Sequence, residues 1–280
     1  MRLATIRTAT GTRAVRIDGD RAVETGHADV GELLAAADWR AAAEAADGPV
    51  HERSGLDYAP VVPRPGKIIC VGVNYGNHIK EMGRETPEYP TLFAKYPEAL
   101  IGAYDDVLLP AASEAVDWEA ELAVVIGSRV RHADAATAEA AIAGFTVLND
   151  VTARDWQYRT LQWLQGKTFE ATTPIGPELV TPDEAGLQGP GTGLDLSCTV
   201  DGETVQTANT DDMVFGAVAT IAYVSTILTL NPGDVLALGT PGGVGHARKP
   251  PRYLTPGAVL TTSISGLGEL RNTCVPEKHA

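Results

Sequence analysis

Short apolar segments separated by glycine and proline constrain the fold of this chain more than any other feature. From Lys67 onward, such segments alternate with turns at fairly regular spacing, a pattern that predicts a β-rich sandwich or barrel. Two stretches interrupt it with helical character, the Ala-rich residues 134–143 and the longer residues 210–230. We therefore expect an α+β fold that is rich in strands.

The beginning of the chain has a different character. Residues 2–25 contain short apolar runs around Gly-containing turns, which favour strands, and residues 29–47 have helical apolar spacing with Asp29 as a possible cap. A proline-rich passage over residues 59–66 follows and is typical of a boundary. The prediction is a small N-terminal α/β domain over residues 1–62 and a main domain over residues 63–280.

Charge and cysteine content narrow the class of protein. The net charge of -14 argues against nucleic acid and anionic membranes as partners. No apolar run approaches the ~20 residues that cross a bilayer, and the first residues lack the apolar stretch of a signal peptide. The three cysteines (Cys70, Cys198 and Cys274) match no zinc pattern and cannot all pair, which favours reduced thiols in the cytoplasm.

Acidic residues occur where two segments otherwise resemble buried strands. Glu119 and Glu121 are two residues apart, so on a strand they point to the same face, and Asp150 ends the next such segment. Neighbouring carboxylates repel one another unless something compensates them. A set of carboxylate oxygens suits Mg²⁺, Mn²⁺ or Ca²⁺ better than Zn²⁺. The alternative is a solvated face of an edge strand, formed together with Asp117.

Two further pairs have helical spacing. His78 and Glu81 are three residues apart, and a carboxylate beside an imidazole favours its role as a proton acceptor, suited to activating water. Arg154 and Gln157 have the same spacing and could hold a carboxylate and an oxygen atom of a ligand. The alternatives are a surface His–Glu pair and a surface salt bridge between Arg154 and Asp155 or a neighbouring residue.

Two glycine-rich segments could contact a ligand. Residues 165–177 carry Lys167 but lack the spacing of a phosphate-binding P-loop. Residues 238–245 follow a strand and could bring backbone N–H groups to a ligand, or form only a tight turn. Three carboxylates and one divalent cation sum to a charge of -1, so an anionic substrate would need the added positive charges of Arg154 and Lys167.

These segments, taken in order, closely resemble the fumarylacetoacetate hydrolase family. The resemblance covers most of the chain between residues 67 and 274 and rests on five stretches: residues 72–78, 116–122, 149–157, 166–169 and 239–245.

The resemblance implies a mixed β-roll catalytic core with a small N-terminal domain, assembled as a homodimer. It implies Mg²⁺ or Mn²⁺ bound by Glu119, Glu121 and Asp150. It also implies that His78, Glu81 and Lys167 are catalytic, and that Tyr75, Arg154, Gln157 and Thr240 bind the substrate.

The activity that this resemblance implies is hydrolysis of a C–C bond in a β-diketo acid, an acylpyruvate such as fumarylpyruvate, to pyruvate and a carboxylic acid. Decarboxylation of oxaloacetate is an alternative, because it needs the same metal and enolate stabilisation but no attacking water. A hydratase or isomerase of an unsaturated 2-oxo acid is another, and a non-catalytic binding protein is disfavoured by the intact residue set. The residues considered for a distal carboxylate are Lys80, Arg84, Tyr89 and Arg252.

Overall fold

The computed structural model describes the chain except for residues 82, 84, 185–188 and 279–280 and the side chains of residues 78 and 80. The helices are α1 Val30–Leu34, α2 Trp39–Glu44, α3 Gly76–Glu81, α4 Ala135–Ala140, α5 Arg154–Gln157, α6 Leu164–Lys167 and α7 Ala217–Ile227. The strands are β1 Arg2–Thr8, β2 Gly11–Asp18, β3 Arg21–Glu24, β4 Val50–Glu52, β5 Ile68–Gly72, β6 Thr91–Lys95, β7 Leu100–Ile101, β8 Val107–Leu109, β9 Val116–Asp117, β10 Ala120–Ile126, β11 Ile142–Asn149, β12 Thr152–Ala153, β13 Thr173–Val180, β14 Asp195–Val200, β15 Glu203–Asn209, β16 Val235–Ala237, β17 Val259–Ile264 and β18 Gly268–Pro276.

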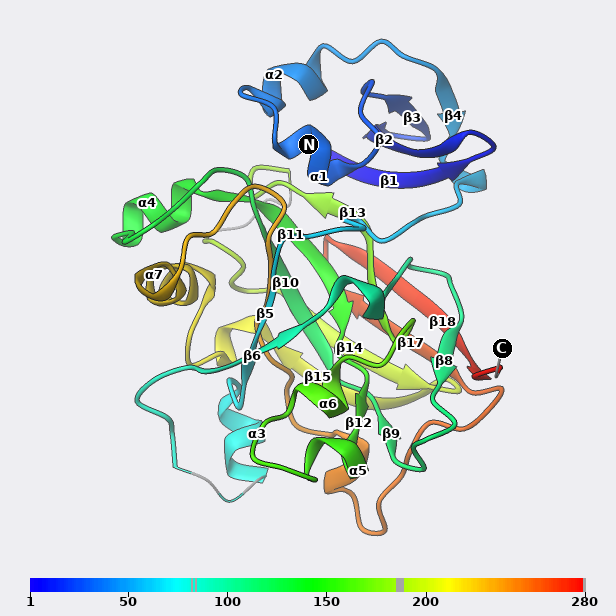
Figure 1. Cartoon of the computed structure of the whole chain (residues 1–280), viewed down its shortest axis with the longest axis vertical. Coiled ribbons are helices and arrows are strands. Elements are labelled where there is room, and N and C mark those ends of the chain that lie inside the picture. The colour runs from blue at the N-terminus through cyan, green and yellow to red at the C-terminus, as the bar shows by residue number, and fades with distance from the viewer. Residues whose placement is uncertain (82, 84, 185–188, 279–280) are drawn as a thin grey trace.

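The strands form one long mixed sheet and one smaller sheet (Figure 1). The long sheet has the order β4-β3-β2-β1-β13-β11-β10-β16-β5-β6, with β7 added beside β13. The smaller sheet has the order β15-β14-β17-β18-β8 and packs against β10, β11 and β13. β9 and β12 form a separate pair. The predicted β-rich α+β fold is confirmed.

The central strands of the long sheet are covered on both faces. All residues of β10 are buried, and its side chains alternate between two apolar clusters. Leu122 and Val124 pack toward the smaller sheet, whereas Ala123 and Val125 pack with the apolar face of α1. Because both faces are buried, a carboxylate in this region must find a cation or a hydrogen-bond donor within the protein.

The predicted helices are present but shorter than expected. The span 29–47 divides into α1 and α2, because Asp38 accepts a hydrogen bond from the N–H of Ala41 and starts a second helix. Asp29 caps α1 as predicted. Residues 142–143 leave the predicted helix for β11, and Asn209 caps a separate 3₁₀ turn at Thr210–Asp212 before α7 begins.

The N-terminal strands, drawn in blue in Figure 1, continue the long sheet, because β1 pairs with β13 as well as with β2. α1 and α2 lie beside these strands. The division at residues 62 and 63 stays a prediction. Within the part of the chain that the structure describes, no helix is long and apolar enough to cross a membrane.

Candidate active site

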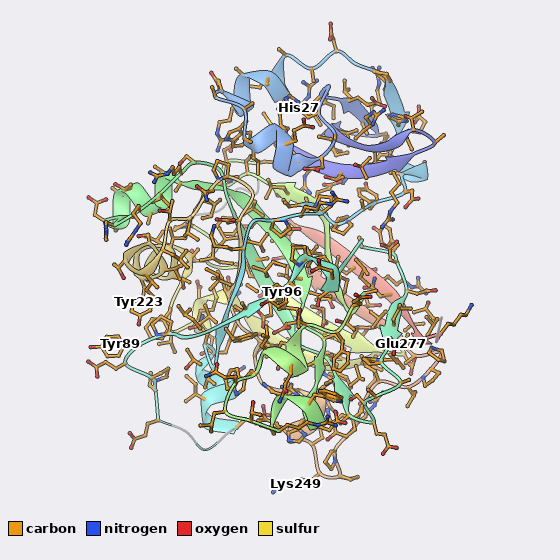
Figure 2. The ribbon with its side chains drawn as sticks, viewed as in Figure 1. His27, Tyr89, Tyr96, Tyr223, Lys249 and Glu277 are labelled. Atoms are coloured by element: carbon orange, nitrogen blue, oxygen red, sulfur yellow. The ribbon has the colours of Figure 1, made fainter. Side chains whose placement is uncertain are left out.

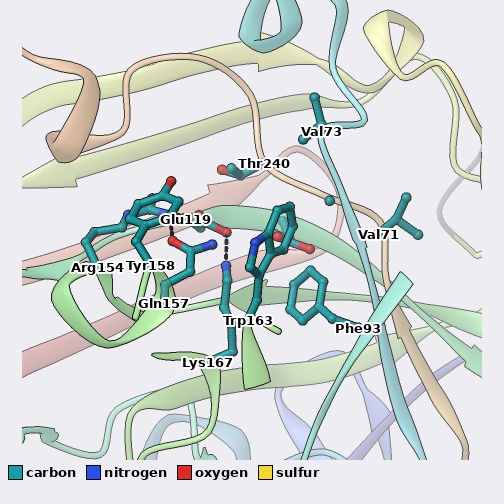
Figure 3. A pocket seen from close by; sticks show the side chains of 12 residues that line it. Val71, Val73, Phe93, Glu119, Arg154, Gln157, Tyr158, Trp163, Lys167 and Thr240 are labelled. Carbon is teal, nitrogen blue, oxygen red and sulfur yellow. Dashed lines mark hydrogen bonds and ion pairs between the residues drawn. The ribbon is translucent and has the colours of Figure 1, made fainter. Parts of the chain in front are cut away.

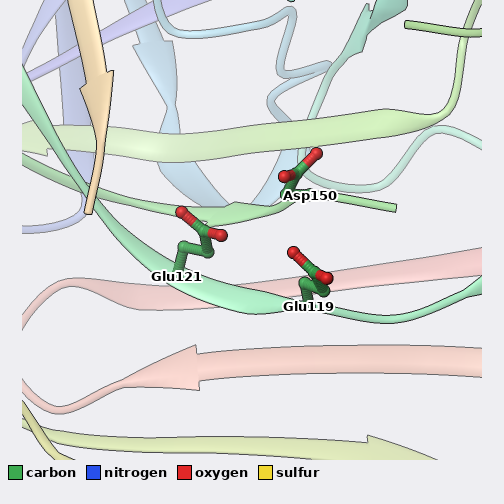
Figure 4. A group of neighbouring side chains, drawn as sticks. All are labelled: Glu119, Glu121 and Asp150. Atoms are coloured by element: carbon green, nitrogen blue, oxygen red, sulfur yellow. The ribbon is translucent and has the colours of Figure 1, made fainter. Parts of the chain in front are cut away.

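Glu119, Glu121 and Asp150 converge at one end of β10 and β11 (Figure 4). One carboxylate oxygen from each lies within 4.8 Å of the others, and all three residues are buried. Backbone pairing brings them together: the N–H of Asp150 donates to the carbonyl oxygen of Glu119 at 2.8 Å, and Glu121 lies opposite Leu148. The prediction that the three carboxylates gather is confirmed, and the alternative of a solvated edge strand is wrong.

Two buried lysines face this acidic cluster. Nζ of Lys167 lies 2.6 Å from Oε2 of Glu119 and 2.7 Å from Oδ2 of Asp150. Nζ of Lys95 lies 2.6 Å from Oδ1 of Asp150 and also donates to the carbonyl oxygen of Lys167. The sequence analysis did not include Lys95. Its signal was a lysine that ends the otherwise uncharged strand segment 91–95.

The electrostatics of the cluster favour a hard divalent cation. Burial, and then the charges of Asp150 and Glu119, raise the pKa of Glu121 well above its ordinary value. Burial alone would lower the pKa of Lys167, but Asp150 and Glu119 more than offset it, so this pKa rises and the side chain stays protonated. The charge of Lys167 and the N–H of Gly239 offset the rise at Glu121 only in part. Three convergent carboxylates match the oxygen ligands of Mg²⁺ and Mn²⁺.

Arg154 is held by buried carboxylates of the site. Its Nε donates to Oδ2 of Asp117 at 2.8 Å, and its Nη1 lies 2.7 Å from Oε1 of Glu119. The alternative of a surface salt bridge to Asp155 is wrong, because Asp155 accepts from Ser113 and Arg154 is buried. Burial opposes the charge of Arg154, but Glu119 and Asp117 outweigh it and raise its pKa. Nη2 is buried and has no hydrogen-bond partner among the described residues.

Gln157 and Thr240 complete a polar wall. Oε1 of Gln157 accepts from Nη1 of Arg154 at 2.9 Å, which leaves its amide nitrogen to donate. Oγ1 of Thr240 accepts from Nε2 of Gln206 at 2.8 Å, which leaves its hydroxyl hydrogen to donate. Each of these oxygens thus already accepts one hydrogen bond within the protein, and each side chain keeps a donor.

A cavity opens in front of these groups (Figure 3). Its empty volume, including the open mouth, is about 420 Å³. Arg154, Gln157, Lys167 and Thr240 line it together with Glu119 and Glu121, and the less polar wall consists of Val71, Gly72, Val73, Phe93, Tyr158 and Trp163. The space is suited to a small anionic ligand beside the carboxylates.

The helix with the predicted His–Glu pair lies next to the glycine-rich loop. Glu81, at the exposed end of α3, accepts from the N–H of Gly243 at 3.2 Å, and Oδ1 of Asn77 accepts from the N–H of Gly242 at 3.2 Å. Glu81 is not among the described residues that line the cavity. The backbone of His78 belongs to α3, but its side chain lies outside what the structure describes.

Other predicted residues lie apart from the cavity. Tyr75 is fully buried, and its hydroxyl has no hydrogen-bond partner among the described residues. Tyr89 packs against Tyr223 of α7 with ring centroids 6.3 Å apart, at the left edge of Figure 2. Nη1 of Arg252 binds Glu203 at 2.6 Å. The side chain of Lys80 and all of Arg84 lie outside the described residues.

The sequence analysis missed several groups of this site besides Lys95. Asp117 was considered only as part of an exposed face, yet it is fully buried behind Arg154. Tyr158 and Trp163 form part of the cavity wall and follow Arg154 within a few residues. Aromatic residues in a loop after a predicted substrate arginine were the available signal.

The chain is similar to known proteins in both sequence and structure. Residues 67–275 match the family model for the fumarylacetoacetate (FAA) hydrolase C-terminal domain. The chain is 47% identical over 232 residues to a Rattus norvegicus protein named oxaloacetate tautomerase Fahd2a, mitochondrial, a match that covers 82% of this chain and 73% of the relative.

Two solved structures are also similar. Fumarylacetoacetate hydrolase from Exiguobacterium antarcticum has a TM-score of 0.87 and 31% identity, over 99% of this chain and 100% of the other. Maleylpyruvate hydrolase from Sphingobium sp. SYK-6, in complex with manganese(II) and pyruvate, has a TM-score of 0.82 and 30% identity, over 99% and 100%. With its buried acidic triad, this chain belongs to the fumarylacetoacetate hydrolase family of enzymes.

Proposed function

We propose that this protein is a divalent-metal-dependent enzyme that interconverts the enol and keto forms of oxaloacetate. The observation that supports this most directly is the set of donors in side chains that line the cavity. Above all, Nη2 of Arg154 is buried and unpartnered among the described residues. An unpaired donor in a buried position is costly, so it favours a ligand that brings an acceptor. The similarity to an oxaloacetate tautomerase names the ligand class.

The charge balance of the site favours a dianion. Asp117, Glu119, Glu121 and Asp150 contribute four negative charges, and the three cations Lys95, Lys167 and Arg154 contribute three positive ones. A bound divalent ion would bring the net charge to +1. A 2-oxo diacid would therefore be attracted, although the chain as a whole carries -14.

The roles of the individual residues follow from their contacts. Glu119, Glu121 and Asp150 would hold Mg²⁺ or Mn²⁺, and the bound ion would supply Lewis-acid stabilisation of a 2-oxo group. Lys167, protonated beside Glu119, adds positive charge where the oxygen of the enol becomes negative. Arg154 and Gln157 bind the carboxylate adjacent to the oxo group, and Thr240 donates to a substrate oxygen at the cavity rim.

Tautomerisation moves one proton without oxidation or cleavage. The enol hydroxyl loses a proton and C3 gains one. The site therefore needs a side chain that can both accept and donate a proton near pH 7. We propose the pair His78 and Glu81 for this transfer, because an imidazole oriented by a carboxylate exchanges protons in that range. Glu81 is fixed by the N–H of Gly243, which supports an orienting role.

Hydrolysis of an acylpyruvate, the activity expected first from the sequence, is a second candidate. The maleylpyruvate hydrolase structure, which contains manganese(II) and pyruvate, favours it. The same pair would then remove a proton from water instead of acting at C3. Decarboxylation of oxaloacetate needs the same stabilisation of an enolate and could accompany either reaction.

Parallel assays distinguish these activities. Ketonisation of enol-oxaloacetate is followed by loss of its ultraviolet absorbance, and pyruvate release is measured from oxaloacetate, fumarylpyruvate and acetylpyruvate, each with Mg²⁺, Mn²⁺ or EDTA. We expect metal-dependent ketonisation faster than any pyruvate release. Faster metal-dependent pyruvate release from a diketo acid would instead make the protein a hydrolase.

Assembly and location are also proposals. We expect a homodimer, which light scattering coupled to size-exclusion chromatography would test, with a monomeric mass as the contrary result. The cytoplasmic location predicted from the reduced cysteines is kept, although the similar Rattus norvegicus protein is named mitochondrial. Localisation of a tagged chain in its own cells would decide between the two compartments.

A further inference from the structure

Asp117 is a buried carboxylate of the site that does not belong to the acidic triad. It accepts from the N–H groups of Trp118 at 2.8 Å, Gly245 at 2.7 Å and His246 at 2.9 Å. It also accepts from Nε of Arg154 at 2.8 Å. Four donors around one fully buried side chain satisfy its oxygens, so Asp117 is a fixed anchor rather than a group open to ligands.

Asp117 fixes one edge of the guanidinium of Arg154. Glu119 and Gln157 hold a second edge through Nη1. Because the guanidinium is planar and rigid, fixing two edges determines where the remaining nitrogen points. That nitrogen is Nη2, which has no hydrogen-bond partner among the described residues, in a side chain that lines the cavity.

The same anchor connects Arg154 to the glycine-rich loop. Backbone N–H groups of residues 239–246 bind three carboxylates of the site: Gly239 binds Glu121, Gly243 binds Glu81, and Gly245 and His246 bind Asp117. A Cβ atom on Gly245 would lie 2.7 Å from Oδ1 of Asp117, so this close approach requires glycine. One loop thus sets the relative positions of a metal-site carboxylate, α3 and the arginine.

We propose that Asp117 is a positioning residue that orients Arg154 for the carboxylate of the substrate. The proposal rests on the function proposed above, in which Arg154 binds a 2-oxo acid. Replacing Asp117 with Asn removes one of the two carboxylate charges that balance Arg154, the other being that of Glu119. The new amide keeps one acceptor oxygen. At the position of Oδ1 this loses the bonds from Arg154 and His246, and at the position of Oδ2 it loses those from Trp118 and Gly245. Either way, part of the connection between Arg154 and the loop is lost.

The test measures ligand binding separately from turnover. Oxalate, which presents two adjacent carboxylates, is titrated calorimetrically into the Mn²⁺-loaded protein, and KM and kcat are measured with oxaloacetate. For Asp117→Asn we expect the Kd of oxalate and the KM to rise about tenfold or more, while kcat changes by less than about threefold. Unchanged oxalate affinity in a folded Asp117→Asn protein would overturn the proposal.

Asp234→Asn is the matched control. Asp234 is also buried, pairs with one cation, Lys67, at 2.7 Å, and accepts from one backbone N–H, that of Asn231 at 2.7 Å. It lies outside the cavity lining. We expect this variant to lose stability but to keep the oxalate affinity of the wild type. A similar loss of affinity in both variants would show that general destabilisation causes it, and would also overturn the proposal.

A double-mutant cycle with Arg154→Met separates positioning from a structural role. If Asp117 acts through Arg154, Asp117→Asn should weaken oxalate binding much less in the Arg154→Met background, and additive losses would contradict this.

If Asp117→Asn does not fold, the pair His246→Pro and His246→Ala isolates one N–H bond to Asp117. We expect weaker oxalate binding in the proline variant, whereas equal affinities would refute the proposal.

These measurements distinguish the proposed role of Asp117 from the proposed ketonisation of oxaloacetate. A wild-type protein that binds oxalate but does not ketonise oxaloacetate contradicts the proposed function, while the oxalate data still decide the role of Asp117.

Discussion

Nζ of Lys95 lies 2.6 Å from Oδ1 of Asp150, and both side chains are fully buried. Lys95 also donates to the carbonyl oxygen of Lys167, so it connects the backbone of α6 to the acidic cluster. A buried ion pair contributes most clearly when one member is removed, because the other charge is then left uncompensated. Lys95 therefore supports the position of Lys167 and places a positive charge beside the carboxylate of Asp150.

Lys95→Met is expected to lower the free energy of unfolding of the metal-free protein by about 3 kcal/mol, because Lys167 is then the one cation left beside Asp150 among the described residues. Mn²⁺ should stabilise this variant more than it stabilises the wild type, because the ion replaces the positive charge lost beside Asp150. A ligand that binds only the folded state stabilises it by about 2.7 kcal/mol at 100 times its Kd. Urea denaturation with EDTA and with Mn²⁺ measures both effects.

Lys67→Met provides the control for this prediction. Lys67 also pairs with a buried carboxylate, that of Asp234 at 2.7 Å, but it lies outside the cavity. Mn²⁺ should stabilise this variant only as much as it stabilises the wild type. If Mn²⁺ stabilised both lysine variants equally beyond its effect on the wild type, the metal would not act by compensating the charge at Asp150.

Glu121 gives the metal-free protein a specific pH dependence. Its folded-state pKa is raised by burial, Asp150 and Glu119, so above the ordinary value of 4.5 the folded state holds a proton that the unfolded chain has released. The free energy of unfolding should therefore fall as pH rises from about 4.5 toward the raised pKa. Denaturation in EDTA across this range measures the slope, and Glu121→Gln should reduce it.

Mn²⁺ binding should oppose the fall in the free energy of unfolding as pH rises, because the ion requires the deprotonated carboxylate of Glu121. Calorimetry in buffers of different ionisation enthalpy should detect proton release on binding. Binding without proton release would contradict a protonated Glu121 in the metal-free protein.

The sequence predicted the centre of the site better than its surroundings. Glu119 and Glu121 were recognisable because the period of a strand is two residues, and Asp150 because it ended the next strand. Lys95 and Asp117 were not, because their partners are distant in sequence: Lys95 and Asp150 are 55 residues apart, and Asp117 and Gly245 are 128 apart. Such pairs depend on sheet order, which the local pattern does not determine.

The fold prediction had the same limit. The strand-rich class followed from local periodicity, whereas the helix predicted over residues 29–47 was divided by a second cap at Asp38. Asn209 showed the same ambiguity, because a residue that can cap a long helix can equally cap the short turn before it. Capping residues mark possible helix starts, and tertiary packing selects among them.

His78→Ala tests the proposed proton transfer. We expect it to lower ketonisation of oxaloacetate, and any hydrolysis of acylpyruvates, by about 100-fold, the usual contribution of a general acid–base group. Decarboxylation of oxaloacetate should be spared, because breaking that C–C bond needs enolate stabilisation but no attacking water. Equal loss of all activities, with unchanged oxalate affinity, would refute the separate roles of His78 and the metal site.

Gly243→Ala tests whether the loop positions α3. Gly243 has a φ of 99°, and an added Cβ would collide with the carbonyl oxygen of Val205, so the loop must move and its N–H must leave Glu81. We expect ketonisation to fall at least tenfold through kcat, because Glu81 no longer orients His78.

Gly257→Ala is the matched control, since Gly257 has a φ of 87° but nothing within 4 Å of a Cβ. It carries the same strain, about 1 kcal/mol or more, and should leave kcat unchanged. A similar fall in kcat for both variants would mean that backbone strain, and not the contact with Glu81, limits the reaction.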